Sequence, residues 1–152
     1  MNHDHAYRNL GLMLFLSFVT MYVLMYAMVN TFSNVLPNYN QFYMAGLMAS
    51  PMALIELWLM RSMYRDKKKN LLIIALSLVL IALFWLGVRQ QRAINDEQFL
   101  RSMIPHHAGA ILMCEKAQIE DTEIRELCRG IVEGQQTEIE LMKSKLEELK
   151  TR

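Results

Sequence analysis

The chain has 152 residues, of which 53% are hydrophobic and 20% are charged, and this balance excludes a disordered chain. The charge is unevenly placed, because 22 of the 31 charged residues lie after residue 88, which excludes an evenly mixed soluble globule. The formal net charge of +1 leaves no basic surplus to neutralise phosphates, so we expect no nucleic acid partner.

Three apolar runs predict three transmembrane helices, at about residues 10–32, 42–62 and 71–88. A helix of about 20 apolar residues is long enough to cross a bilayer. The first run contains no charged residue, and residues 42–60 of the second contain one, Glu56. We therefore expect residues 1–88 to form a membrane domain embedded in the lipid bilayer.

The second run also carries a methionine stripe, because Met44, Met48, Met52 and Glu56 recur at steps of four. Thioethers bind soft cations, and an ionisable side chain inside a membrane span is costly and often functional. One interpretation is a copper conduit. The other is that methionine fills gaps between lipid-embedded helices while Glu56 reaches the basic loop that follows.

The basic residues of the loops predict the orientation. The loop between the second and third runs holds Arg61, Arg65 and the lysines at 67–69, whereas the loop around residues 33–41 holds no Lys or Arg. Basic loops stay on the cytoplasmic side. We expect the N-terminus to be cytoplasmic and residues 89–152 to be extracytoplasmic. The expected location is the inner (cell) membrane of a bacterium, with residues 89–152 in the periplasm.

Residues 89–152 are helical in pattern and predict an αα-hairpin with its turn near residues 119–122. Asn95 or Asp96 can cap the first helix, and Asp121 or Thr122 can cap the second. Two helices of this length bury too little apolar surface to be stable alone. The expected fold class is all-α: three transmembrane helices followed by a hairpin that forms a four-helix bundle by oligomerisation, as a homodimer or higher homo-oligomer. The alternative is that the hairpin packs on its own third span.

Sulfur, imidazole and amide side chains line the predicted seam between the two hairpin helices. They are Met103, His106, His107, Cys114, Cys128, Gln135 and Met142. Met103, His107 and Cys114 share a helix face, and folding the hairpin about residue 121 places Cys114 opposite Cys128 and His107 opposite Gln135. Methionine with histidine outside the cytoplasm indicates Cu(I) or Ag(I), because thioethers hardly bind harder ions.

Other metals fit the pattern less well. Zinc prefers a tetrahedron of Cys, His and carboxylate ligands with characteristic spacings, and di-iron bundles need Glu-x-x-His pairs; the sequence has neither. Cys114 and Cys128 can form a disulfide, serve as soft ligands, or be two small buried residues. A disulfide requires local close approach, because helix axes pack about 8–10 Å apart and bridged Cα atoms lie within about 7 Å.

Two motifs carry a family resemblance. Residues 96–113 read D-x-x-F-L-x-x-M-I-P-H-H-x-x-A-I-x-M, and residues 131–142 read I-x-x-x-Q-x-x-E-I-x-x-M. Over about residues 93–146 the chain resembles the family called domain of unknown function 305. The resemblance implies a ferritin-like helical bundle, an extracytoplasmic location and an association with copper or silver binding and resistance. It also implies a ligand set, and that set is Met103, His106, His107, Met113 and Met142. The chain departs from the family at Cys114, where alanine is more common.

The sequence favours a binding protein over an enzyme, because it shows no nucleophile–base pair, phosphate-binding loop or carboxylate dyad. We expect a membrane-anchored protein that buffers Cu(I) or Ag(I) or passes the ion to a copper-handling partner protein. One alternative is a copper transporter that uses the methionine-lined spans. Another is a structural or assembly subunit whose hairpin docks on another membrane protein.

Overall fold

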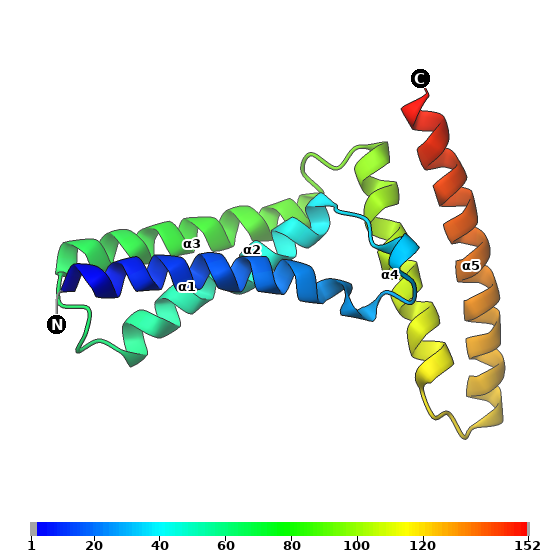
Figure 1. Cartoon of the computed structure of the whole chain (residues 1–152), viewed down its shortest axis with the longest axis horizontal. Helices are drawn as coiled ribbons and strands as arrows, with labels where there is room; N and C mark the ends of the chain where they lie inside the picture. Colours follow the sequence, from blue (N-terminus) through cyan, green and yellow to red (C-terminus); the bar gives the residue numbers. More distant parts are fainter. Residues whose placement is uncertain (1–2, 152) are drawn as a thin grey trace. The chain divides into compact units, whose positions relative to one another are not determined.

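The computed structural model describes residues 3–151, and every regular element in that range is a helix (Figure 1). The chain forms two compact units. The first, which we call the three-helix unit, runs up to Leu24 and resumes over Asn40–Ala93. The second, the hairpin unit, combines Met25–Tyr39 with the chain from Ile94 onward. The all-helical fold class is therefore confirmed.

The three-helix unit consists of α1 (His3–Leu24), α2 (Tyr39–Leu59) and α3 (Lys67–Gln90). All three predicted membrane helices are present. By length and composition, His5–Met28, Tyr39–Leu59 and Lys67–Gln90 are each apolar enough to cross a membrane, which is consistent with membrane association. Large apolar side chains such as Phe15, Trp58 and Leu71 are exposed in the chain, as expected for helices that lipid surrounds.

The helix boundaries differ from the sequence-based prediction. The first run was expected to extend to residue 32, but α1 ends at Leu24 and is followed by two short 3-10 helices, η1 (Met25–Met28) and η2 (Phe32–Asn34). Local hydrogen bonds fold this stretch on itself, because Tyr26 Oη donates to the Leu36 carbonyl oxygen at 2.9 Å and Asn34 Nδ2 donates to Asn30 Oδ1 at 2.9 Å. Residues 25–39 are called the cap segment below.

The third helix begins earlier than residue 71. Asp66 is its N-cap, and its Oδ1 accepts hydrogen bonds from the backbone N–H groups of Lys68 and Lys69 at 2.9 and 3.1 Å. This cap satisfies two of the free donors of the first turn. It therefore brings the charged lysines, which the hydropathy pattern had placed in the loop, into the helix.

Small residues on α2 bring the helices of the three-helix unit into contact. Ala45, Ala49 and Ala53 are buried, and the Phe84 ring of α3 lies directly against Gly46. Small residues allow helix backbones to approach closely in membranes. The methionines beside this row point outward, since Met44 and Met48 are 39% and 46% exposed.

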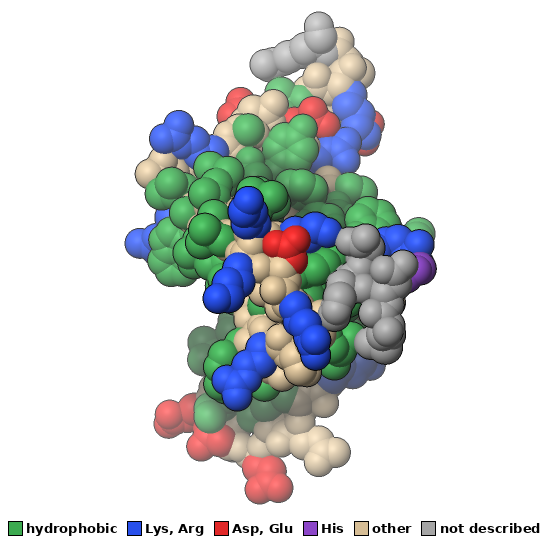
Figure 2. All heavy atoms as spheres, turned by 90° about the vertical axis from the view of Figure 1, so that its left-hand side faces the viewer, with side chains coloured by type: hydrophobic (Ala, Val, Ile, Leu, Met, Phe, Trp, Pro, Cys, Tyr) green, Lys and Arg blue, Asp and Glu red, His purple; other side chains and the backbone are tan. Residues whose placement is uncertain are grey.

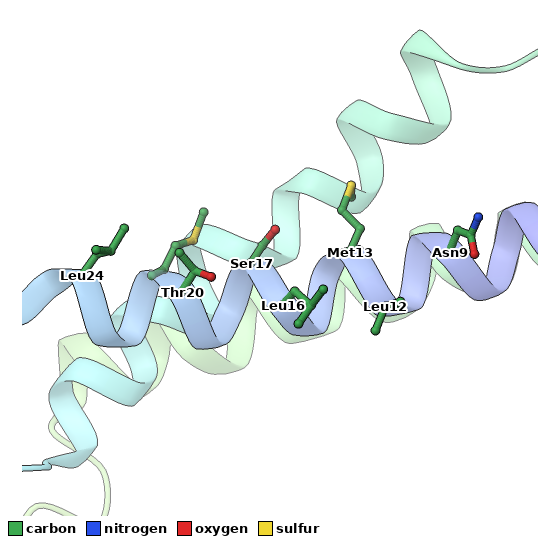
Figure 3. A pocket seen from close by; sticks show the side chains of 8 residues that line it. Asn9, Leu12, Met13, Leu16, Ser17, Thr20 and Leu24 are labelled. Atoms are coloured by element: carbon green, nitrogen blue, oxygen red, sulfur yellow. The ribbon is translucent and has the colours of Figure 1, made fainter.

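A shallow groove of about 590 Å³ runs along α1. Figure 3 shows that the side chains lining it, from Asn9 to Leu24, all come from this one helix. Its lining is mostly apolar, with Asn9, Ser17 and Thr20 as the polar exceptions. A groove of this composition on a candidate membrane span fits contact with acyl chains or another apolar helix.

The hairpin unit contains α4 (Asp96–Lys116) and α5 (Thr122–Lys150), which run antiparallel (Figure 1). Asn95 caps α4 by accepting a hydrogen bond from the Gln98 N–H, and Asp121 caps α5 by accepting from Glu123 and Ile124. The predicted hairpin, its turn and its two caps are thus confirmed. Pro105 lies buried inside α4.

The core of the hairpin unit is an apolar seam between its two helices. Ile104, Ala108 and Ile111 from α4 pack with Ile139 and Leu146 from α5, and all five are at most 5% exposed. Burying one such isoleucine stabilises the fold by roughly 1.5–3 kcal/mol.

The cap segment belongs to this core. Val29 and Leu36 pack against the same apolar cluster, and Met28 lies beside Gly109 of α4. The sequence-based boundary at residue 88 had placed the cap segment in the membrane domain. It joins the hairpin unit because Val29 and Leu36 pack against the apolar cluster that α4 and α5 form.

The close contact between α2 and α3 can be tested at Gly46. Gly46→Leu is expected to lower the free energy of unfolding in detergent by about 1–3 kcal/mol, because the added side chain must displace the Phe84 ring. Gly11→Leu is the matched control, since nothing lies within 4 Å of a Cβ added there. Equal thermal stability of the two variants would contradict the packing.

Candidate functional site

The centre of the candidate site is a hydrogen bond that joins the two hairpin helices. His107 Nε2 lies 2.7 Å from Glu138 Oε2. His107 comes from the middle of α4 and its side chain is 10% exposed, whereas the Glu138 side chain, on α5, is 58% exposed. A carboxylate only accepts hydrogen bonds, so the imidazole donates through Nε2 and its tautomer is fixed by this partner.

The other ring nitrogen has no partner. His107 Nδ1 is buried and makes no hydrogen bond with any residue that the structure describes. With Nε2 carrying the proton, Nδ1 presents a lone pair inside the fold. Leaving such a buried acceptor unsatisfied costs about 1–3 kcal/mol. An imidazole held by a carboxylate through one nitrogen and open at the other is the usual arrangement of a metal-binding histidine.

Met103 is the predicted ligand best placed to join His107. It is half-buried and precedes His107 by four residues, so the two side chains lie on the same face of α4. On α5, Met142 follows Glu138 by four residues, so these two also share a helix face, and Met142 packs against the apolar core. The thioether of Met103 and the imidazole of His107 are therefore two soft donors on one face of α4.

Two further ligands implied by the family resemblance, His106 and Met113, are exposed. His106 is exposed, and its ring centroid lies 6.0 Å from that of His107. Met113 is 54% exposed, and ten residues of helix place it about 15 Å along the axis from Met103. Within the described residues no three His, Cys, Asp or Glu side chains are grouped as a metal site.

The two cysteines form a disulfide. Cys114 and Cys128 are bonded, with their Cα atoms 5.3 Å apart, and no cysteine is free. Their inclusion among the soft ligands is therefore wrong for this oxidised chain, because metal binding requires a thiolate. The close approach is possible because both residues lie near the turn, where α4 and α5 are joined by only a few residues.

The sequence-based register missed one functional candidate by a single helical turn. Folding about residue 121 placed Gln135 opposite His107, but the side chain that meets the imidazole is Glu138. Gln135 is half-buried and makes no hydrogen bond to His107 within the part of the chain that the structure describes. Glu138 was visible as the acidic residue of the second motif, three residues after Gln135, and an imidazole opposite a carboxylate would have been the stronger pairing.

Comparison with known proteins finds a family match that includes this hairpin. The model of the family described as Domain of unknown function (DUF305) matches residues 88–146. The chain is also similar to Uncharacterized protein L153 of Acanthamoeba polyphaga mimivirus, with 35% identity over 142 residues that cover 91% of each chain. The chain belongs to the DUF305 family. No solved structure matches it.

Removal of the disulfide tests its contribution. The Cys114→Ala/Cys128→Ala double variant is expected to lose about 3 kcal/mol of unfolding free energy, as for a loop closed by residues 14 apart. Chemical denaturation with and without a reductant measures the loss. The reductant should destabilise the parent chain and leave the double variant unchanged. The parent chain can also be denatured without a reductant and treated with a maleimide. Labelling of two thiols per chain would contradict the Cys114–Cys128 disulfide.

Proposed function

We propose that the hairpin unit binds Cu(I) or Ag(I) as cargo, with His107 Nδ1 and the Met103 thioether as its principal donors. The observation that carries this proposal is the orphaned, buried Nδ1 of an imidazole whose Nε2 is held at 2.7 Å by Glu138. A metal ion at Nδ1 would satisfy the unpaired nitrogen. Glu138 would then orient the ring and raise its basicity without touching the ion.

The donor set favours a soft monovalent ion. Imidazole and thioether together suit Cu(I), whereas zinc sites use three or four His, Cys or carboxylate ligands. No such group exists among the described residues. His106 supplies a second imidazole on the exposed side of α4, where an arriving or departing ion would meet it.

The proposed role of the hairpin unit is to bind the ion and then buffer or transfer it, and not to catalyse a reaction. The His107–Glu138 pair has no nucleophile among its hydrogen-bond partners, and no reacting group is needed to hold an ion. The ion would be buffered, giving copper resistance, or handed to a copper-handling partner protein. A conduit through the spans is less well supported, because Met44 and Met48 point away from the helix contacts of the three-helix unit.

We further propose that the hairpin unit lies outside the cytoplasm, in the periplasm of a bacterium whose inner membrane holds the spans. The disulfide supports this location, because such bonds persist in oxidising compartments. Chain connectivity supports it too: three crossings place the cap segment and residues 94–152 on one side, and these two segments pack together. The cap segment contains no Lys or Arg, in line with the positive-inside rule.

A second copy of the hairpin would complete a ferritin-like four-helix bundle in this proposal. Phe99, Leu127 and Leu141 are 50%, 63% and 59% exposed on the two helices. Apolar side chains on an otherwise charged hairpin favour association, since two helices alone bury little surface.

The metal proposal is tested by anaerobic Cu(I) titration of the full chain in detergent against a chromophoric chelator. His107→Ala is expected to weaken Cu(I) binding on the order of 100-fold and Met103→Leu on the order of tenfold. Glu138→Ala should cost about 10–100-fold by freeing the ring. Glu138→Gln should cost less, because the amide oxygen can still accept from Nε2.

Gln136→Ala, an exposed change on the same helix as Glu138, is the matched control and should leave the affinity unchanged. Parent-like affinity of His107→Ala would contradict the assignment of Nδ1. A parent chain that binds no Cu(I) would contradict the proposed function as a whole and favour an assembly role for the hairpin.

The proposed sidedness predicts the behaviour of reporter fusions in a bacterial host. Alkaline phosphatase fused after the hairpin should be active, because it folds only outside the cytoplasm, and the same reporter fused in the loop after α2 should be inactive. Green fluorescent protein at the two positions gives the opposite pattern. An active phosphatase in the basic loop would overturn the orientation.

A further inference from the structure

A cluster of cations occupies the end of the three-helix unit where α2 passes into α3. The connecting loop and the first turn of α3 hold Arg61, Arg65 and the lysines at 67–69. Figure 2 shows Lys and Arg side chains gathered around one acidic side chain on the near face. We call these five residues the basic cluster.

The acidic side chains nearest in sequence to the basic cluster already accept hydrogen bonds. Asp66 caps α3 through two backbone N–H groups, and Glu56 accepts a hydrogen bond from Tyr64 Oη at 3.2 Å. Burial, followed by the Glu56 carboxylate, raises the pKa of Tyr64 above its ordinary value, so the phenol remains a donor. Among the described residues, Arg61 and Lys68 form no ion pair.

The lysines in the first turn of α3 do not stabilise that helix. Residues 67–69 occupy the first turn, where the helix dipole is positive and favours acidic side chains. Three cations at this end oppose the dipole and one another. The Asp66 carboxylate caps this turn, and an external anion near Lys67 and Lys68 would offset the remaining positive charge.

The basic cluster stands on an ordered scaffold. Tyr7 Oη donates to Asn70 Oδ1 at 2.8 Å and accepts from the Asp66 N–H at 3.1 Å. Asn70 Nδ2 in turn donates to the Tyr64 carbonyl oxygen at 2.8 Å, and the Tyr7 and Tyr64 rings lie 5.2 Å apart. A loop fixed in this way loses little further freedom when it binds a ligand.

Exposed apolar side chains continue from the cations along the helices. Leu71 and Leu72 follow the lysines on α3 and are 69% and 68% exposed, and Trp58 at the end of α2 is 73% exposed. Cations above an exposed apolar surface match a ligand with an anionic head and an acyl tail.

We propose that the basic cluster binds the phosphodiester headgroup of an anionic membrane lipid. The phosphate contacts Arg61, Lys67 and Lys68, and the acyl chains lie along Leu71 and Leu72. The lipid anchors the loop between α2 and α3 at the bilayer surface and neutralises the first turn of α3. This site is separate from the metal proposal and uses none of its residues.

The test is native mass spectrometry of the full chain, released from detergent micelles that contain equal amounts of phosphatidylglycerol and phosphatidylcholine. The parent chain should retain phosphatidylglycerol in preference. Lys67→Gln/Lys68→Gln should lower that preference on the order of tenfold, since each cation near an anionic headgroup contributes a several-fold factor. Arg61→Gln, a single change in the loop outside the helix, should lower it to a smaller extent.

Lys143→Gln/Lys145→Gln on α5 removes the same charge elsewhere and should leave the preference unchanged. Equal retention of the two lipids by the parent chain would overturn the proposal. So would an equal loss in the α5 control, which would indicate a general charge effect. Displacement of the lipid by excess inorganic phosphate at constant ionic strength would overturn the lipid as ligand and assign the cluster to free phosphate.

Discussion

The apolar seam between α4 and α5 is the constraint on which the hairpin unit depends. Ile104, Ile111 and Ile139 are its largest fully buried side chains, and their interdigitation fixes the rotation of each helix about its own axis. That rotation turns His107 toward α5 rather than toward solvent. The imidazole is therefore positioned by hydrocarbon packing, and the Glu138 carboxylate only completes its orientation.

Three interactions of different kinds hold the two hairpin helices in register. The disulfide joins them near the turn, the His107–Glu138 hydrogen bond joins them at mid-length, and Leu146 continues the seam toward the open end. The cap segment covers a further face of α4 with Val29 and Leu36. A chain segment that lies far away in sequence thus contributes to a core too small to be stable from two helices alone.

The similarity to a known protein extends beyond the hairpin. The DUF305 model matches residues 88–146, which include α4 and most of α5. The similarity to the mimivirus protein covers 91% of both chains and so includes the three-helix unit as well. Both units of this chain therefore lie within a stretch shared with a similar protein, and our two proposals give each unit its own ligand: a soft metal ion for the hairpin and an anionic lipid for the basic cluster.

The sequence was sufficient for everything that local chemistry and hydropathy control. The three apolar helices, the hairpin, its turn and the caps at Asn95 and Asp121 follow from uncharged runs, periodicity and side chains that accept backbone hydrogen bonds, all of which act within a few residues. The soft side chains of the hairpin were likewise visible in the motifs. The presence of these side chains in the sequence did not show which of them lie close together in the fold.

What required the folded chain was the choice of contacts between distant residues. The disulfide was one of three open interpretations until the Cα atoms of Cys114 and Cys128 were found 5.3 Å apart. The sequence-based register placed Gln135 opposite His107, whereas the rotation of the packed helices brings Glu138 there. The role of the cap segment had no local signal at all, because packing between residues far apart in sequence is governed by the shape of the surfaces they bury, and that shape exists only after the helices have come together.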